Sequence, residues 1–150
     1  MDFQVEEIPN LRIAYLRRTG PYGPENKDVM ERLKKWAKEK DLLKEDSILF
    51  AIAQDNPEVI PPEQCRFDAC LVIPEDYKLE DEIIMEGKLS RGKYVVFKVR
   101  HTAQDLQKAY AEIFPILQRS GYQIKNKPII EKYEGKMVKN DYCEICIPVV

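Results

Sequence analysis

Two carboxylates near the end of the chain stand in segments that otherwise have the composition of strands. Glu144 interrupts the closing run 142–149, and Glu131 lies between Ile129 and Tyr133 in the segment before it. Burying a lone carboxylate costs several kcal/mol unless a partner compensates its charge. Each of these residues is therefore either a strand residue that faces water or a member of a functional site.

Strand alternation decides which neighbours each carboxylate keeps. Successive side chains of a strand point to opposite faces, so Glu144 shares a face with Cys146, while Glu131 shares a face with Ile129 and Tyr133. If both strands direct these residues into one concave surface, the result is a cavity with tyrosine walls and an acidic floor. Such a cavity favours cationic or aromatic ligands through the carboxylate and the ring faces. The alternative is that one or both acids are ordinary strand residues in water.

Four cysteines raise the question of a metal site. Cys143 and Cys146 have the spacing of a CxxC pair, and Cys65 and Cys70 could supply two more thiolates. Residues three apart on a strand point to opposite faces, so the pair cannot hold one ion without breaking the strand. We expect four reduced, metal-free cysteines that pack as small apolar residues.

No other motif indicates a catalytic centre or a cofactor. The single histidine, His101, lies between an expected strand and the cap of a helix, with no Ser or Cys nucleophile motif to serve. A local hydrogen bond or plain exposure is its expected role. The run 20–24 has two prolines where a phosphate-binding loop would need backbone donors, so we expect no nucleotide cofactor.

A repeat organises the elements that must position these residues. The same Ile-Pro ending occurs at Ile73-Pro74 and Ile147-Pro148, and each half has the pattern of a strand, a helix and two strands. The expected strands are 11–18, 48–54, 67–73, 93–100, 128–133 and 142–149, and the expected helices are about 26–40 and 103–119. We predict one antiparallel sheet with both helices packed on the same face.

Length and charge exclude several classes of partner. The 150 residues are predicted to form one domain, with halves at about 1–76 and 83–150. Charged residues make up 33% but cancel to a net charge of −2, so no field attracts the chain to nucleic acid or to an anionic membrane. Without a signal peptide or a membrane-spanning run, the protein is expected to be cytoplasmic. Open sheet edges leave both a monomer and a homodimer possible.

Four stretches together are similar to one known family. They are 55–69 (DNPEVIPPEQCRFDA), 92–97 (GKYVVF), 120–122 (SGY) and 127–133 (KPIIEKY). They resemble GyrI-like proteins, the family of the DNA gyrase inhibitor and of the effector-binding domains of AraC- and MerR-type regulators. The resemblance extends over nearly the whole chain, from Val5 to Val149.

The resemblance implies an α+β fold of duplicated strand-helix-strand-strand (SHS2-type) units with a pseudo-twofold axis and a ligand cleft where the halves meet. Family members use a buried Glu and aromatic residues to hold lipophilic, often cationic, compounds, and Glu131 and Glu144 are the matching carboxylates here. Combined with the alternation, this predicts that both carboxylates point into one shared cleft. The aromatic residues expected to line it are Tyr133, Tyr15, Tyr110 and Phe97.

Three functions remain open from the sequence. The first is a stand-alone domain, without a DNA-binding half, that binds small molecules for sensing or for protection against toxins or drugs. The second is a hydrolase of cyclopropane-bearing DNA-alkylating compounds, with Glu144 or Glu131 as the catalytic acid or water-orienting group. The third is a protein that binds DNA gyrase or a regulator. The family often has Trp before a helical Pro where this chain has Phe114-Pro115, so ligand specificity is not carried over.

Overall fold

The computed structural model describes residues 1–135 and 140–150. Its strands are β1 (Gln4–Ile8), β2 (Leu11–Thr19), β3 (Ile48–Ala53), β4 (Arg66–Val72), β5 (Met85–Leu89), β6 (Gly92–Arg100), β7 (Ile130–Glu134) and β8 (Tyr142–Pro148). The helices are α1 (Glu25–Glu39), α2 (Ala103–Arg119) and the short 3-10 helix η1 (Pro62–Gln64). No helix in the described residues is long and apolar enough to span a membrane.

The strands form one eight-stranded antiparallel sheet in the order β1-β6-β8-β7-β3-β4-β2-β5. Two equivalent units, β2-α1-β3-β4 and β6-α2-β7-β8, meet at the centre of the sheet, where β3 pairs with β7. This duplicated α+β arrangement confirms the fold class predicted from the sequence.

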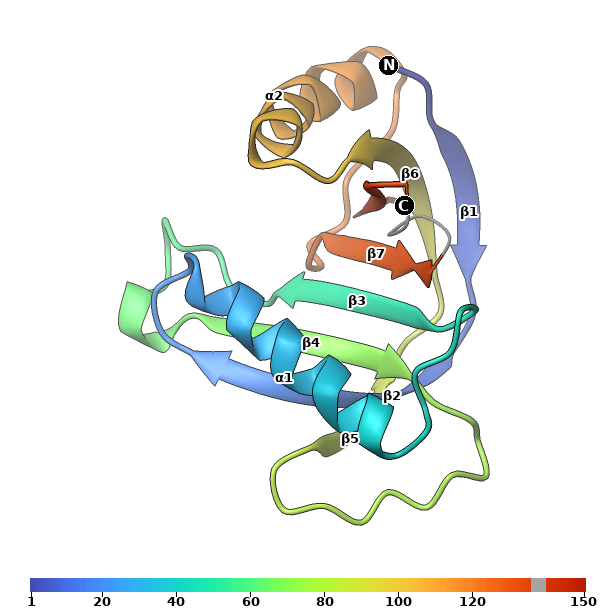
Figure 1. The fold of residues 1–150 in the computed structure, drawn as a ribbon. Coiled ribbons are helices and arrows are strands. Elements are labelled where there is room, and N and C mark those ends of the chain that lie inside the picture. Colours follow the sequence, from blue (N-terminus) through green and yellow to red (C-terminus); the bar gives the residue numbers. More distant parts are fainter. Residues whose placement is uncertain (136–139) are drawn as a thin grey trace.

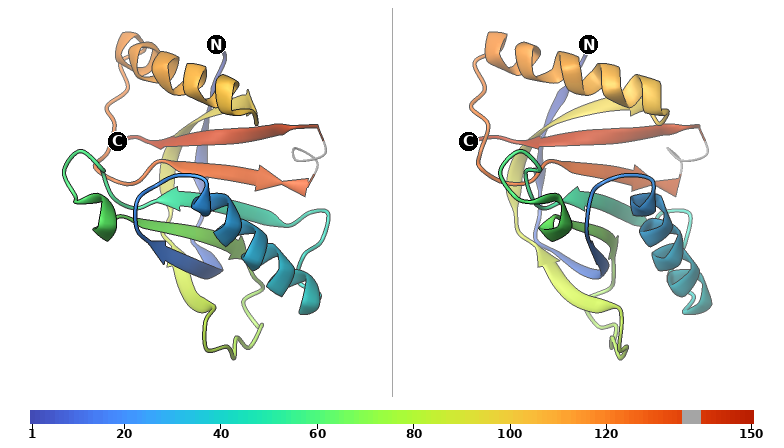
Figure 2. Two further views of the ribbon diagram at one scale, coloured as in Figure 1. Left: turned by 60° about the vertical axis from the view of Figure 1, so that its left-hand side comes forward. Right: turned by 90° about the vertical axis from the view of Figure 1, so that its left-hand side faces the viewer.

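Both helices pack on the same face of the sheet, as the sequence predicts (Figures 1 and 2). Leu33 of α1 packs in a cluster with sheet residues of the first unit, and Ile113 of α2 packs in the matching cluster of the second. Tyr133 of β7 packs against both clusters. Each helix therefore covers its own half of the sheet, and the central strands lie between the two helices.

The sheet is strongly curled because its two units exchange their edge strands. β1 precedes the first unit but pairs with β6 of the second, while β5 precedes the second unit but pairs with β2 of the first. Only Pro9 and Asn10 connect β1 to β2, so these strands, which are first and seventh in the sheet order, must approach each other. The Asn10 Oδ1 atom accepts a hydrogen bond of 2.7 Å from the backbone N of Arg91, which ties the two crossing connections together.

The concave face formed by this curling is filled by its own side chains. Phe50 and Ile130 from the central strands pack there with Tyr94 and Cys146, all almost fully buried. The sheet therefore has an apolar interior on the face without helices, and the face that carries the helices is the one left partly open.

Candidate functional site

A cleft of about 1240 Å³ lies on the helix-bearing face of the sheet, between α1 and α2. Met30 of α1 forms part of one wall, and Leu106 and Tyr110 of α2 form part of the other. The floor includes Ala51 of β3 and Glu131 of β7, which are direct partners in the pairing of these strands. The cleft thus sits where the two units meet, over the centre of the sheet.

The two units contribute different chemistry to this cleft. The equivalent pairings of β3 with β4 and of β7 with β8 make Leu49 and Ala51 the counterparts of Glu131 and Tyr133. At these positions the first unit has apolar side chains, of which Ala51 lines the cleft, whereas the second unit has a carboxylate and a phenol that both line it. The small side chain of Ala51 leaves space directly beside Glu131.

Glu131 is held by two phenols. Its Oε1 atom accepts a hydrogen bond of 2.8 Å from the Tyr110 hydroxyl, and its Oε2 atom accepts one of 2.7 Å from the Tyr133 hydroxyl. Burial, together with the nearby carboxylate, raises the pKa of both phenols far above the usual value, so they remain protonated donors. In the described part of the chain no Lys, Arg or His forms an ion pair with Glu131. The floor of the cleft therefore carries an oriented carboxylate that has no cationic partner among residues 1–135 and 140–150.

His101 extends this chain of polar groups to the mouth of the cleft. Its Nε2 atom lies 3.3 Å from the Tyr133 hydroxyl, and the two rings meet edge to face with centroids 5.0 Å apart. The side chain is exposed, as the sequence suggested, but its partner belongs to the site. Sequence reasoning missed this contact because no local pattern relates the end of β6 to β7.

Glu144 lies on the opposite, concave face of the sheet, so the prediction of a cleft shared with Glu131 is wrong. In the pairing of β7 with β8, Glu131 faces Ile145 and Lys132 faces Glu144, and adjacent positions point to opposite faces. The Lys132 ammonium lies 3.8 Å from Glu144, and burial raises the pKa of this carboxyl despite the lysine. Glu144 therefore belongs to a partly buried ion-pair group on the concave face, outside the cleft.

Two of the predicted aromatic residues also lie outside the cleft. Tyr15 is on the concave face, where the Arg17 guanidinium lies 5.5 Å from its ring centroid. Phe97 is fully buried beneath α2 against Phe3. Of the predicted set, the structure brings together Glu131, Tyr133 and Tyr110.

The four cysteines are free and buried. Cys143 packs in the cluster under α2 and Cys146 in the cluster on the concave face, as strand alternation predicts. Burial raises the pKa of each of these two thiols to about 12. Among the described residues, no group of three or more His, Cys, Asp or Glu side chains is placed to hold a metal ion.

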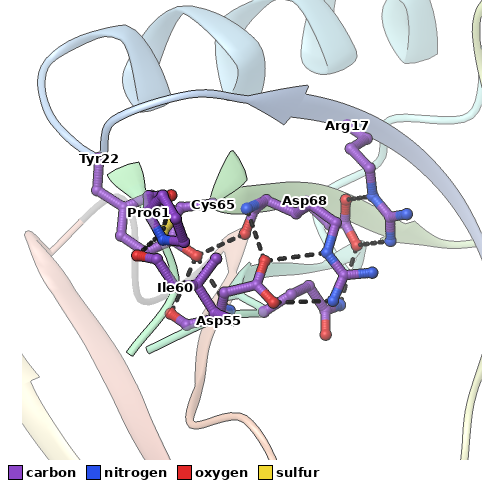
Figure 3. A network of polar contacts seen from close by, with 9 residues as sticks. Arg17, Tyr22, Asp55, Ile60, Pro61, Cys65 and Asp68 are labelled. Atoms are coloured by element: carbon purple, nitrogen blue, oxygen red, sulfur yellow. Dashed lines mark hydrogen bonds and ion pairs between the residues drawn. The ribbon is translucent and has the colours of Figure 1, made fainter. Parts of the chain in front are cut away.

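A polar network fixes one end of the cleft (Figure 3). The buried Asp68 accepts hydrogen bonds of 2.7 and 2.8 Å from Arg17 and one of 2.9 Å from Gln54. Beside it, Asp55 is bound by the Arg66 side chain, which lowers the pKa of this carboxyl to about 2. Both Gln54 and Asp55 line the cleft, so the network holds the loop after β3 in place at its edge.

Tyr22 connects this network to the start of α1. Its hydroxyl donates a 2.7 Å hydrogen bond to the carbonyl of Arg66 and accepts a 3.1 Å bond from the backbone N of Asp55. Because Tyr22 lies three residues before Glu25, the first residue of α1, these bonds set the position of the α1 wall relative to the floor.

Comparison with known proteins places this geometry in a family. The model of the family described as GyrI-like small molecule binding domain matches residues 1–150. The SPbeta prophage-derived protein YosT of Bacillus subtilis (strain 168) is 37% identical over 150 residues, which cover 99% of each chain. A DNA gyrase inhibitor of Salmonella typhimurium is 28% identical over 154 residues, covering 99% of this chain and 98% of the inhibitor.

Solved structures share the fold at low sequence identity. The EcmrR C-terminal domain superposes with a TM-score of 0.73 at 15% identity, covering 99% of this chain and 97% of that domain. SAV2435 bound to tetraphenylphosphonium gives a TM-score of 0.64 at 15% identity, covering 100% and 94% of the two chains. A hydrolase from Listeria innocua gives 0.67 at 10% identity, covering 99% and 91%. At these identities the likeness concerns the fold alone.

Proposed function

Because the chain belongs to the family of GyrI-like small molecule binding domains, we propose that it binds a lipophilic cation or a cationic aromatic compound in the cleft between α1 and α2. The observation that carries this proposal is the set of contacts that Glu131 makes. Its two oxygens are oriented by Tyr110 and Tyr133, yet no cationic side chain in the described residues pairs with it. A ligand cation would supply a counter-charge to Glu131 where little water screens the pair.

The residues of the cleft walls favour a ligand whose body is apolar. Met30 lines the cleft from α1 and Leu106 lines it from α2, and the hydroxyls of Tyr110 and Tyr133 bind the carboxylate. Flexible thioether and aromatic surfaces adapt to flat hydrophobic compounds, and ring faces attract cations. A volume of about 1240 Å³ accommodates a ligand of drug size. Sensing or sequestering such compounds is the biological role that this chemistry favours.

Tetraphenylphosphonium provides a direct test, because the similarly folded SAV2435 is bound to it. We expect this cation to bind, and its affinity to fall stepwise as Ala51 is replaced by Ser, Val and Leu, with a loss of about tenfold for Leu. The larger side chains fill the space beside Glu131 without changing any charge. Calorimetric titration measures the affinity, and thermal unfolding of each variant checks its fold. Unchanged affinity in a folded Ala51→Leu protein would place the ligand elsewhere.

Hydrolysis of a reactive ligand in the same cleft is a second candidate, favoured by the run of polar groups from Tyr110 through Glu131 and Tyr133 to His101. Such a run could orient a water molecule or move a proton to the mouth of the cleft. A two-carboxylate mechanism is not supported, because Glu144 lies across the sheet. Time-dependent loss of an electrophilic ligand with formation of its water adduct would favour turnover, whereas recovery of intact ligand would favour binding alone.

The similarity to a protein named DNA gyrase inhibitor supports a third candidate, binding to gyrase. This activity would need a protein-binding surface and no chemistry in the cleft. It is tested by co-purification with gyrase subunits and by a supercoiling assay, both with the wild type and with the Ala51→Leu variant. Equal inhibition by both proteins would show that gyrase binding is independent of the cleft.

A further inference from the structure

The two ends of the cleft differ in chemistry. Glu131 is paired with Ala51, the first residue of β3 that lines the cleft, so the acidic end of the cleft lies beside this part of the strand. The opposite end lies beyond the last residue of β3, where the first turn of α1 is tied to Asp55 through Tyr22. We call this second region the amide end and define it by four cleft-lining residues, Asn26, Lys27, Asn56 and Asn126.

The hydrogen bonds already made at the amide end leave donors available and use up acceptors. Asn26 accepts a 3.1 Å bond from the Arg18 guanidinium through its Oδ1 atom, and Asn56 accepts a 2.9 Å bond from the backbone N of Glu58. Because both partners are donors, the amide oxygens must be the groups turned toward them. The two amide NH2 groups, the Lys27 ammonium and the Asn126 side chain have no partner of their own within residues 1–135 and 140–150.

The nearby carboxylates do not cancel this donor surface. Asp55 accepts three hydrogen bonds of 2.8–2.9 Å from the side chain and backbone N of Arg66, so its charge is already compensated. Glu31, farther along α1, lies 3.7 Å from Lys34. Glu25 and Asp28, in the same turn as Lys27, are exposed and do not line the cleft. The backbone N–H groups of Asn26 and Lys27 are bonded to the carbonyls of Gly23 and Pro24, and Glu25 and Asp28 oppose the dipole of α1, so the donors at the amide end are its side chains.

We propose that the ligand of this cleft is bipolar: an apolar or aromatic body with a cationic group at Glu131 and a carboxylate or similar anion at the amide end. This inference rests on the proposed function and adds a second recognition point to it. A plain lipophilic cation would satisfy Glu131 but would leave Lys27 and the amide NH2 groups to water. An anionic group at the other end would accept hydrogen bonds from an ammonium and amides together, and such charge-assisted bonds are the stronger kind.

Rhodamine B and its ethyl ester form a matched pair of probes for this proposal. Both have the same planar cationic body, but only rhodamine B has a free carboxylate at neutral pH. We expect the wild-type protein to bind rhodamine B about tenfold more tightly than the ester, as measured by fluorescence anisotropy. In the double variant Lys27→Met/Asn126→Ala, we expect the affinity for rhodamine B to fall about tenfold and that for the ester to stay within about twofold.

Lys38→Met is the control, because Lys38 has the same charge on the same helix but does not line the cleft. It should leave both affinities within about twofold, since exposed charges at a distance are screened by salt. If the wild type binds the ester as tightly as rhodamine B or more tightly, the proposal of a bipolar ligand is wrong, while the proposal of cation binding still holds. Loss of both dyes by a protein that binds tetraphenylphosphonium also overturns it. Failure of both dyes and of tetraphenylphosphonium to bind contradicts the proposed function itself.

Discussion

Replacing Glu131 with Gln is expected to weaken the binding of a lipophilic cation by about 1.5–3 kcal/mol, or roughly 10- to 150-fold. Gln keeps the shape of the side chain but removes the negative charge that has no cationic partner among the described residues. It also offers one acceptor oxygen in place of two, so the Tyr110 and Tyr133 hydroxyls cannot both keep their present hydrogen bonds. Titration with tetraphenylphosphonium measures the loss.

The same experiment has two internal controls. Neutral aromatic ligands of similar size should bind the wild type and Glu131→Gln with nearly equal affinity, because they do not depend on the charge. Glu144→Gln makes the same chemical change on the opposite face of the sheet, so it should leave cation binding within about twofold. If Glu131→Gln binds cations with the affinity of the wild type, the Glu131 carboxylate does not take part in recognising the ligand.

Replacing Asp68 with Ala is expected to lower the free energy of unfolding by about 3 kcal/mol. Asp68 is 3% exposed and accepts hydrogen bonds from Arg17 and Gln54. Its removal leaves a guanidinium and an amide without their acceptor in a partly buried setting. The expected loss is at the lower end of the range for broken buried pairs. The reason is that the Arg17 side chain is 32% exposed, so water can hydrate it in part.

Urea unfolding measures this effect. The exposed Asp28 of α1 provides a matched control, and Asp28→Ala should change the free energy of unfolding by no more than about 0.5 kcal/mol. The double variant Arg17→Met/Asp68→Leu should be more stable than Asp68→Ala, because it removes the charge that would otherwise lie unpaired. A loss below about 1 kcal/mol for Asp68→Ala would mean that water replaces the carboxylate and that the network does not hold this end of the cleft.

The helices and most strands followed from local patterns. The helix predicted at 103–119 is α2, and the one predicted at about 26–40 is α1 to within one residue at each end. Apolar residues at helical spacing define these segments, because the buried face of an amphipathic helix requires an apolar residue every three or four positions. The edge strands β1 and β5 were not predicted. Both are short and mostly exposed, so they have no continuous apolar alternation to reveal them.

The site was predictable within each strand and not between strands. Alternation correctly grouped Glu131 with Tyr133 and placed Cys143 and Cys146 on opposite faces, because the period of a strand is a local property. Whether Glu131 and Glu144 share a face depends on the register between β7 and β8. Register is fixed by the packing of the whole sheet, and a shift of one residue exchanges the two faces.

The sequence by itself determined the duplicated α+β fold, the family and the presence of a carboxylate flanked by an aromatic residue in β7. Only the tertiary structure decided which face of β7 carries the helices, and hence that Glu131, and not Glu144, lies in the cleft. It also brought Tyr110 and His101 to this carboxylate from elements far away in the sequence. The physical reason is that periodicity fixes the side to which a residue points, whereas the neighbours on that side depend on strand pairing and helix packing across the whole chain.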